Sequence, residues 1–96
     1  MPDMGFRLNA RVNCNDLAAA KRVLEQLLPN GTVRESEGEL LVEAEVAAAT
    51  ARDLNRTLLS ALRRVEKKTR LRAQWTSPDG TTESFFDYAL KKVTKG

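Results

Sequence analysis

The amino-acid sequence predicts an α+β fold in which two helices cover one face of an antiparallel sheet, followed by an additional C-terminal helix. Two observations favour this class. Segments with the two-residue period of strands alternate with segments of helical period, and Gly- or Pro-containing breaks separate them. The chain has 96 residues, of which 42% are hydrophobic and 30% charged, an ordinary balance for one folded domain with one core.

The first part of the chain predicts a strand and a helix. A strand is expected at residues 6–12, where apolar side chains alternate with Arg7, Asn9 and Arg11. Residues 13–16 offer capping side chains, and leucines and alanines then recur at helical spacing over residues 17–28. The Pro-Asn-Gly cluster that follows ends this helix.

A hairpin and a second helix are expected next. Residues 32–37 predict a short, polar edge strand, residues 40–46 predict an alternating strand, and Glu37-Gly38 is the tight connection between them. Thr50 is expected to cap the second helix, with Asp53 as the acid of a capping box. The apolar stripe of this helix comprises Ala51, Leu54, Leu58, Ala61, Leu62 and Val65.

The last part of the chain has two interpretations. Residues 70–76 alternate as a strand, and the Ser-Pro-Asp-Gly sequence that follows is a turn. The preferred interpretation is a helix that begins at Thr81 or Thr82. Its apolar face would be formed by Phe86, Leu90 and Val93. In the alternative, Asp79-Gly80 is a hairpin turn and residues 81–86 form a fifth strand.

The predicted element order is therefore β-α-β-β-α-β with a C-terminal helix. This order is typical of the ferredoxin-like, split βαβ arrangement, in which right-handed crossovers place both main helices on one face of the sheet. We expect a single domain over residues 1–96, with its core at 6–76 and a C-terminal extension at 77–96.

Catalytic chemistry is not expected. The sequence has no histidine and a single cysteine, Cys14, which we interpret as a small residue at a strand end rather than a nucleophile. Glu43 and Glu45 share one strand face, and ion pairs with Arg7 and Arg11 on a neighbouring strand are the plainer interpretation. No glycine pattern or ligand spacing predicts a cofactor or a metal. Cysteine usage, together with the lack of a signal-peptide pattern or membrane-length apolar run, favours the cytoplasm.

The charge pattern favours contact with nucleic acid. Lys and Arg outnumber Asp and Glu by 16 to 13, which makes this a basic protein with a net charge of +3. A basic run crosses from the second helix into the following strand, and a second patch lies near the C-terminus. The candidate RNA-binding residues are Arg63, Arg64, Lys67, Lys68, Arg70, Arg72, Lys91 and Lys92. The alternative is a solvated helix face whose cations stabilise the C-terminal end of the helix dipole.

The alternation of side chains along the strands also bears on how the sheet could contact RNA. Sheet-surface recognition of the kind used by RNA-recognition motifs requires aromatic side chains on the open face of the sheet. Phe6 and Trp75 are expected on the core side, so base stacking on the sheet is not expected.

Leu41 and Leu59 lie outside the regular core pattern, and Leu59 falls at the edge of the helix stripe. This pattern favours a surface for a protein partner or a second copy.

The second helix carries a resemblance to a known family. The segment ELLVEAEV and the following ARDLNRTLLSALRRV are similar to the small, ferredoxin-like subunit of the KEOPS complex, whose helix pattern is close to L-R-x-x-x-N-S-x-L-R-x-hydrophobic. The matching positions are Leu54, Thr57, Ser60, Leu62, Arg63 and Val65. The entry into the first helix at residues 13–18 matches as well, so the resemblance spans residues 6–65.

The chain also departs from that family. Leu59 stands at the family's asparagine, Arg64 stands where an aromatic is common, and the chain continues beyond the usual end of the helix. The sequence therefore resembles a diverged member or paralogue.

The resemblance implies a non-catalytic subunit. Such subunits pair through their ferredoxin-like domains, dock on the threonylcarbamoyl-transferase subunit and help to hold tRNA for modification of an adenosine beside the anticodon. Here the resemblance implies a partner surface near Leu59 and Ser60, and a tRNA contact at the basic run. The alternatives are a homodimeric protein-interaction scaffold without a nucleic-acid role and, less favoured, a small-molecule-binding domain.

Overall fold

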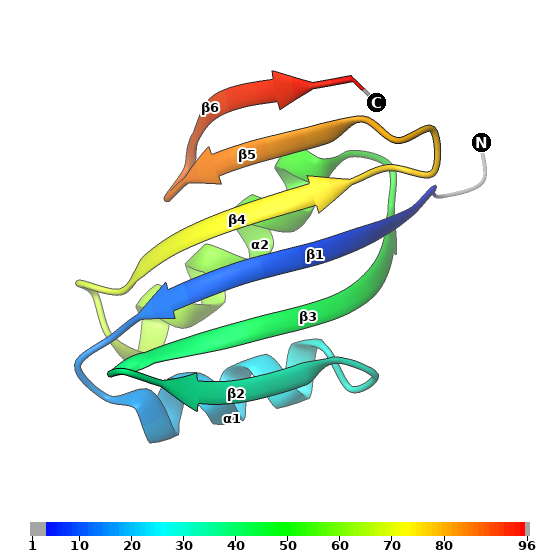
Figure 1. The fold of residues 1–96 in the computed structure, drawn as a ribbon. Helices are drawn as coiled ribbons and strands as arrows, with labels where there is room; N and C mark the ends of the chain where they lie inside the picture. The colour runs from blue at the N-terminus through cyan, green and yellow to red at the C-terminus, as the bar shows by residue number, and fades with distance from the viewer. Residues whose placement is uncertain (1–3, 96) are drawn as a thin grey trace.

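The computed structural model of the protein describes residues 4–95. Two helices pack against one six-stranded antiparallel sheet with the strand order β2-β3-β1-β4-β5-β6 (Figure 1). The strands β2 and β6 are the edges of the sheet, and β1 lies between β3 and β4. The predicted α+β class is confirmed. The expected domain span also includes residues 1–3 and 96, which lie outside the described residues.

The first strand and helix occupy the predicted positions. β1 runs over Met4–Asn13 and α1 over Leu17–Leu27. The Asp16 carboxylate caps α1 by accepting a hydrogen bond from the Ala19 N–H at 3.1 Å. The helix ends just before Pro29, which lacks the N–H that a further turn would need.

The second and third strands form the predicted hairpin. β2 (Thr32–Ser36) is an edge strand, and β3 (Glu39–Ala48) pairs with both β2 and β1. Glu37 and Gly38 make the turn with φ angles of 52° and 80°. Glycine adopts such left-handed angles without the steric cost that a side chain imposes, which explains its place in this tight connection.

The helix α2 (Ala51–Val65) begins at its predicted cap. The Thr50 hydroxyl accepts a hydrogen bond from the Asp53 N–H at 3.2 Å. Leu58 and Leu62 are buried as predicted. Burial of a leucine side chain contributes roughly 1.5–3 kcal/mol, so this face holds α2 on the sheet.

Two positions of α2 differ from the predicted stripe. Leu59, expected at an exposed edge as a partner contact, is 0% exposed, so that prediction is wrong. Val65, expected in the core, is 45% exposed. The buried face instead includes Asn55, which hydrogen-bonds to Trp75 and to the backbone of Asp87. The buried side of α2 is therefore wider than the predicted stripe, and Asn55 ties it to β4 and to the turn after β5.

The C-terminal part of the chain is a β-hairpin, so the predicted C-terminal helix is wrong. β4 (Arg70–Thr76) is followed by β5 (Thr82–Phe86) and β6 (Ala89–Thr94), each antiparallel to its neighbour. Phe85 is buried, whereas the side chains assigned to the helix face are 36–49% exposed: Phe86, Leu90 and Val93. Pairing with β5 satisfies the backbone groups along the free edge of β4, which an isolated helix would leave unpaired.

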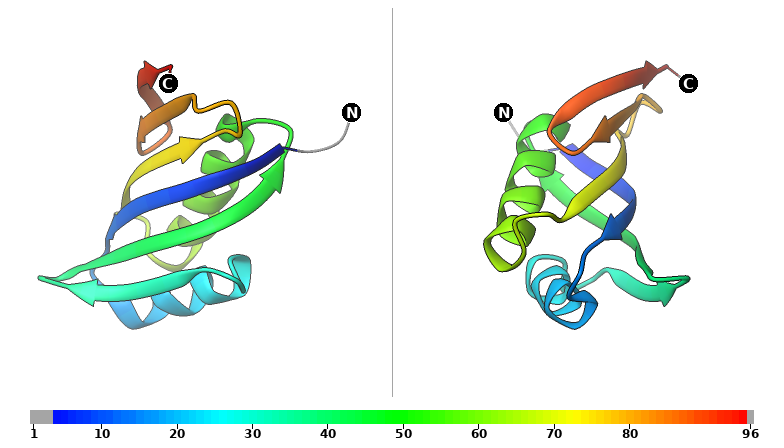
Figure 2. Two further views of the ribbon diagram at one scale, coloured as in Figure 1. Left: turned by 45° about the vertical axis from the view of Figure 1, so that its right-hand side comes forward. Right: turned by 90° about the vertical axis from the view of Figure 1, so that its left-hand side faces the viewer.

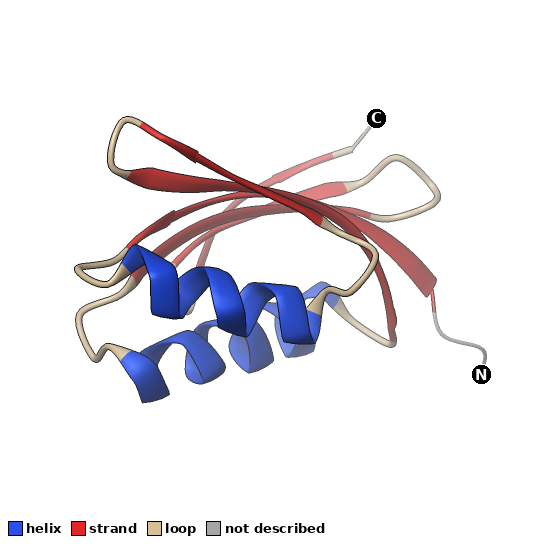
Figure 3. Cartoon of the chain, turned by 90° about the horizontal axis from the view of Figure 1, so that it is seen from below, coloured by secondary structure: helices blue, strands red, loops and turns tan. Residues whose placement is uncertain are grey.

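The molecule has two layers, and only one face of the sheet is covered. Both helices lie on the same face of the twisted sheet, as Figure 3 shows, and Figure 2 shows the two layers from the side. The core between the layers includes Phe6, Leu8, Val12, Leu24, Leu40, Val42, Leu71 and Trp75. The opposite face, called the open face below, has no helix over it within residues 4–95. Neither α1 nor α2 has the length and apolar composition that a membrane-crossing helix needs.

Candidate nucleic-acid interface

The open face presents the polar half of every alternating strand. The buried positions of β1 and β4 point toward the helices, so the residues between them point away. On β1 and β4 this phase exposes four arginines among amides and one threonine: Arg7, Arg11, Arg70 and Arg72. Strand pairing, rather than nearness in sequence, decides which of these cations lie together.

The register of β1 and β4 brings arginines directly opposite each other. Arg11 pairs with Arg72, and Asn13 pairs with Arg70 two residues further along the ladder. Like charges in facing cross-strand positions destabilise the folded state. None of the ion pairs found among residues 4–95 includes Arg11, Arg70 or Arg72. These three residues, the arginine cluster, therefore form a concentration of positive charge without an ion-pair partner among the described residues.

The acidic side of the open face lies on β3. Arg7 is opposite Glu45 and forms an ion pair of 3.8 Å, as predicted. Both side chains are 77% exposed, so the pair contributes little to stability. The second predicted pair does not form, because the register places Arg11 opposite Leu41 and Glu43 opposite Asn9. Of the acidic residues of β3, Glu39 lines a hollow together with the arginine cluster, but it forms no ion pair with it among residues 4–95.

Two adjoining hollows of the open face are both lined by Arg11 and Arg72. One has a volume of about 210 Å³, and its walls are Arg11, Asn13, Glu39, Arg70 and Arg72. The other has a volume of about 340 Å³, and Arg11 and Arg72 line it together with Asn9, Gln74, Ser84 and Phe86. One hollow is dominated by cations, and the other combines cations, amides and an aromatic ring.

Phe86 is the site residue that sequence reasoning assigned to the wrong surface. It lies opposite Arg72 in the ladder, and the Arg72 Cζ atom is 5.1 Å from the centroid of its ring. That separation is typical of a cation–π contact. Phe6 and Trp75 lie on the core side as predicted, and Phe86 adds an aromatic side chain to the open face. The sequence did contain a signal for this placement. In the alternative hairpin interpretation of residues 81–86, Ser84 and Phe86 point to the same side of the sheet as the polar residues of β4.

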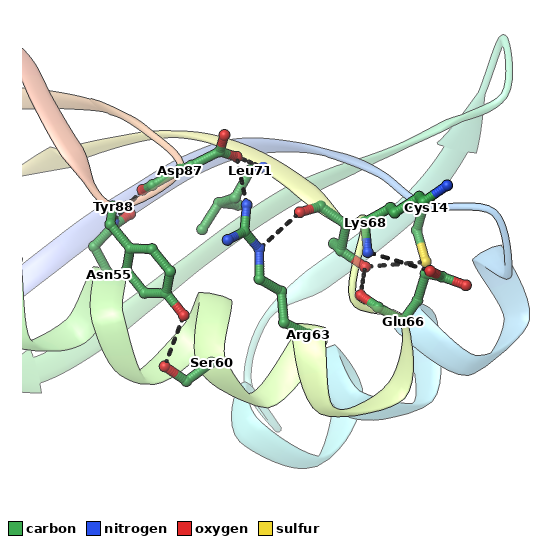
Figure 4. Close-up of polar contacts among 10 residues, drawn as sticks. Cys14, Asn55, Ser60, Arg63, Glu66, Lys68, Leu71, Asp87 and Tyr88 are labelled. Atoms are coloured by element: carbon green, nitrogen blue, oxygen red, sulfur yellow. Dashed lines mark hydrogen bonds and ion pairs between the residues drawn. The ribbon is translucent and has the colours of Figure 1, made fainter.

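Arg63, a predicted RNA contact, is held by other parts of the chain. Its Nε atom donates to the Thr69 carbonyl at 3.1 Å, and its guanidinium lies 3.6 Å from the Asp87 carboxylate (Figure 4). The guanidinium also lies 5.2 Å from the centroid of the Tyr88 ring. Arg63 therefore joins α2 to the start of β4 and to the C-terminal hairpin.

The predicted basic run is divided between two sides of the molecule. Arg64 is exposed in the last turn of α2, and Lys67 and Lys68 are exposed in the connection to β4. Arg70 and Arg72, by contrast, lie on the open face. Lys91 and Lys92 are exposed on the edge strand β6, where the register places Lys92 opposite Ser84. The pairing of β6 with β5 thus extends the positive charge of the open face toward that edge.

The predicted partner residues do not share one surface. Leu59 is in the core, and Leu41 is half-buried on the open face between Arg34 and Arg11. The Ser60 hydroxyl is hydrogen-bonded to the Tyr88 hydroxyl at 3.0 Å on the helix side (Figure 4). Four large apolar side chains of the C-terminal hairpin are exposed instead: Phe86 on the open face, Tyr88 in the turn, and Leu90 and Val93 in phase with the buried Phe85.

Two further features concern the cysteine thiol and metal binding. Cys14 is buried after β1 and accepts a hydrogen bond from the Thr69 hydroxyl at 3.3 Å, as a small residue at a strand end does. Among residues 4–95, no three acidic or cysteine side chains are grouped so that they could hold a metal ion.

Comparisons with known proteins do not assign the chain to a family. Searches against protein-family models, curated proteins and solved structures found no significant match.

Proposed function

We propose that the protein is a non-catalytic, RNA-binding subunit of a cytoplasmic assembly, and that the open face of its sheet contacts the RNA. The observation that carries this proposal is the arginine cluster. Arg11 and Arg72 face each other across β1 and β4, Arg70 lies beside them, and none of the three forms an ion pair among residues 4–95. An anionic ligand offsets the repulsion between facing arginines when it binds. A phosphate backbone fits a row of cations along an extended surface.

The proposal extends to the fold type and the family. The order β2-β3-β1-β4, with both helices on one face, supports a ferredoxin-like core to which β5 and β6 are added. The resemblance of residues 6–65 to the KEOPS small subunit supports a place in a tRNA-modifying assembly, with tRNA as the RNA. A further subunit or a second copy would be the protein partner. Because Leu59 is buried, the pairing surface lies elsewhere than on that residue.

Charge reversal on the open face tests the RNA contact. The measurement is a fluorescence-anisotropy titration of a tRNA transcript with the wild type and with the double variant Arg11→Glu/Arg72→Glu. We expect at least about a tenfold loss of affinity, because two phosphate contacts are replaced by repulsion. The matched control is Arg64→Glu/Lys67→Glu, which makes the same change in net charge at the end of α2. We expect this control to lose less affinity.

Each outcome of that titration decides something. All four side chains are exposed, so circular dichroism should show the wild-type fold in both variants. Loss of affinity in the control alone would move the RNA contact to the end of α2. Equal losses would mean that only net charge matters. Failure of the wild type to bind tRNA would overturn the proposal.

A homodimeric scaffold without a nucleic-acid role is the second candidate. Two observations favour it: large apolar side chains of the C-terminal hairpin are exposed, and β6 has a free edge. Exposed strand edges and apolar patches are common places of self-association. A wild-type protein that binds no tRNA and sediments as a dimer would support this candidate over the first.

A further inference from the structure

We infer that the open face binds a single-stranded segment of RNA, one base of which stacks on Phe86. This inference rests on the proposed function and specifies the form of RNA that the same face recognises. Phe86 is 49% exposed, beside the arginine cluster. Phenylalanine has no polar group that would reward exposure to water, so a ligand that covers the ring gains free energy.

The two hollows beside the arginine cluster match the two chemical parts of a nucleotide. The hollow of about 210 Å³ is lined by all three members of the arginine cluster and by one carboxylate, Glu39, and its excess of positive charge suits a phosphate group. The hollow of about 340 Å³ contains the Phe86 ring, which suits the flat face of a base. Arg11 and Arg72 line both hollows, so a phosphate and the base attached to its sugar can occupy them together.

Polar side chains around the ring can contact the edge of the base. Asn9, Gln74 and Ser84 follow one another across β1, β4 and β5 in a single row of the ladder. Amide and hydroxyl groups both donate and accept hydrogen bonds, so this row does not restrict the site to one base. Every base has a π-face, and stacking on Phe86 is therefore expected to tolerate most sequences.

The geometry requires an unpaired RNA segment. In a duplex both faces of each base are covered by its neighbours, and the A-form major groove is too narrow for side chains to read. A base can reach Phe86 only where it is free of that stack, as in a loop or a single-stranded end. The sheet then supplies the stacking partner, and the arginine cluster holds the adjacent backbone.

Substitution of Phe86 tests the inference. The probe is an oligonucleotide of about eight uridines, compared with a duplex of equal length. We expect Phe86→Leu to weaken binding of the single strand about 5- to 100-fold and Phe86→Tyr to retain it. Tyr88→Leu is the matched control, because it removes an exposed aromatic of the same hairpin that faces α2. Its affinity should equal that of the wild type.

A fluorescence measurement reports stacking directly. The single native tryptophan, Trp75, is 1% exposed and should not respond to the oligonucleotide. In the variant Phe86→Trp, the new indole should lose emission when uridine stacks on it. Single-strand affinity that falls with Arg11→Glu/Arg72→Glu but is unchanged by Phe86→Leu would overturn the inference and leave the proposed function standing. Tighter binding of the duplex would also overturn the inference. Absence of binding to both the oligonucleotide and tRNA would overturn both proposals.

Discussion

At the scale of single residues, Asn55 connects the core to the C-terminal hairpin. It is 1% exposed, its Oδ1 atom accepts a hydrogen bond from the Trp75 indole at 3.3 Å, and its Nδ2 atom donates to the Asp87 carbonyl at 2.7 Å. Asp87 is tied further, since its carboxylate accepts a hydrogen bond from the Leu71 N–H at 3.0 Å. A buried amide with both ends paired fixes the position of its partners. Asn55 thus helps to hold the hairpin that carries Phe86.

A double-mutant cycle tests this role of Asn55. We expect Asn55→Ala to lower the free energy of unfolding by about 1–3 kcal/mol, because it leaves the buried Trp75 N–H without a partner. In a Trp75→Phe background that N–H is absent, so the same substitution should cost about 1 kcal/mol less. Urea unfolding of the four proteins measures the coupling. Equal costs in both backgrounds would show that the Trp75 hydrogen bond contributes nothing and that Asn55 acts through packing and its bond to the Asp87 carbonyl.

At the scale of elements, the helix and strand boundaries that depend on local sequence patterns were predictable. The pairing of strands that are far apart in the sequence was not. Periodicity and capping residues located β1, α1, the β2–β3 hairpin and α2, because those signals lie within each segment. The apolar spacing of residues 86–93 fits a helix face as well as a hairpin. The free edge of β4 decides between them, and that edge exists only in the folded sheet. For the same reason, the arginine run read along the chain did not predict that Arg11 faces Arg72.

The turn between β4 and β5 depends on Asp79. Its carboxylate accepts hydrogen bonds from the Ser77 hydroxyl and from the Thr81 N–H, and these bonds hold its pKa below the ordinary value. A carboxyl whose folded pKa is lowered contributes stability above its unfolded pKa. That contribution is lost as the pH falls through the folded pKa. The turn is therefore expected to loosen in acid, and the effect is small because Asp79 is fully exposed.

An NMR titration of the Asp79 carboxyl carbon checks this expectation. Its midpoint should lie below that of an unstructured aspartate in the wild type. In Ser77→Ala the pKa should rise toward the ordinary value, since the first of the two donors is removed. An identical midpoint in both proteins would show that the Ser77 hydroxyl does not stabilise the ionised carboxylate.

At the scale of the whole molecule, the positions of the charged side chains matter more for RNA binding than the net charge does. The net charge is only +3, yet the sheet separates two groups of cations. Arg64, Lys67 and Lys68 are exposed at the end of α2, while the arginine cluster and Lys92 lie along β1, β4 and β6. Only the second group is continuous with the Phe86 hollow. The same net charge could therefore bind RNA in two places, and salt dependence can distinguish them.

The salt dependence of single-strand binding counts the cations in contact with phosphate. Each neutralised phosphate contributes about −0.7 to the slope of log K against log salt, so four contacts from Arg11, Arg70, Arg72 and Lys92 predict a slope of about −3. Arg70→Gln should reduce the magnitude by about 0.7, and Phe86→Leu should weaken binding without changing the slope, because stacking releases no counterions. The control Arg64→Gln should leave both affinity and slope unchanged. A slope that responds to Arg64→Gln and not to Arg70→Gln would place the RNA on the helix side of the sheet.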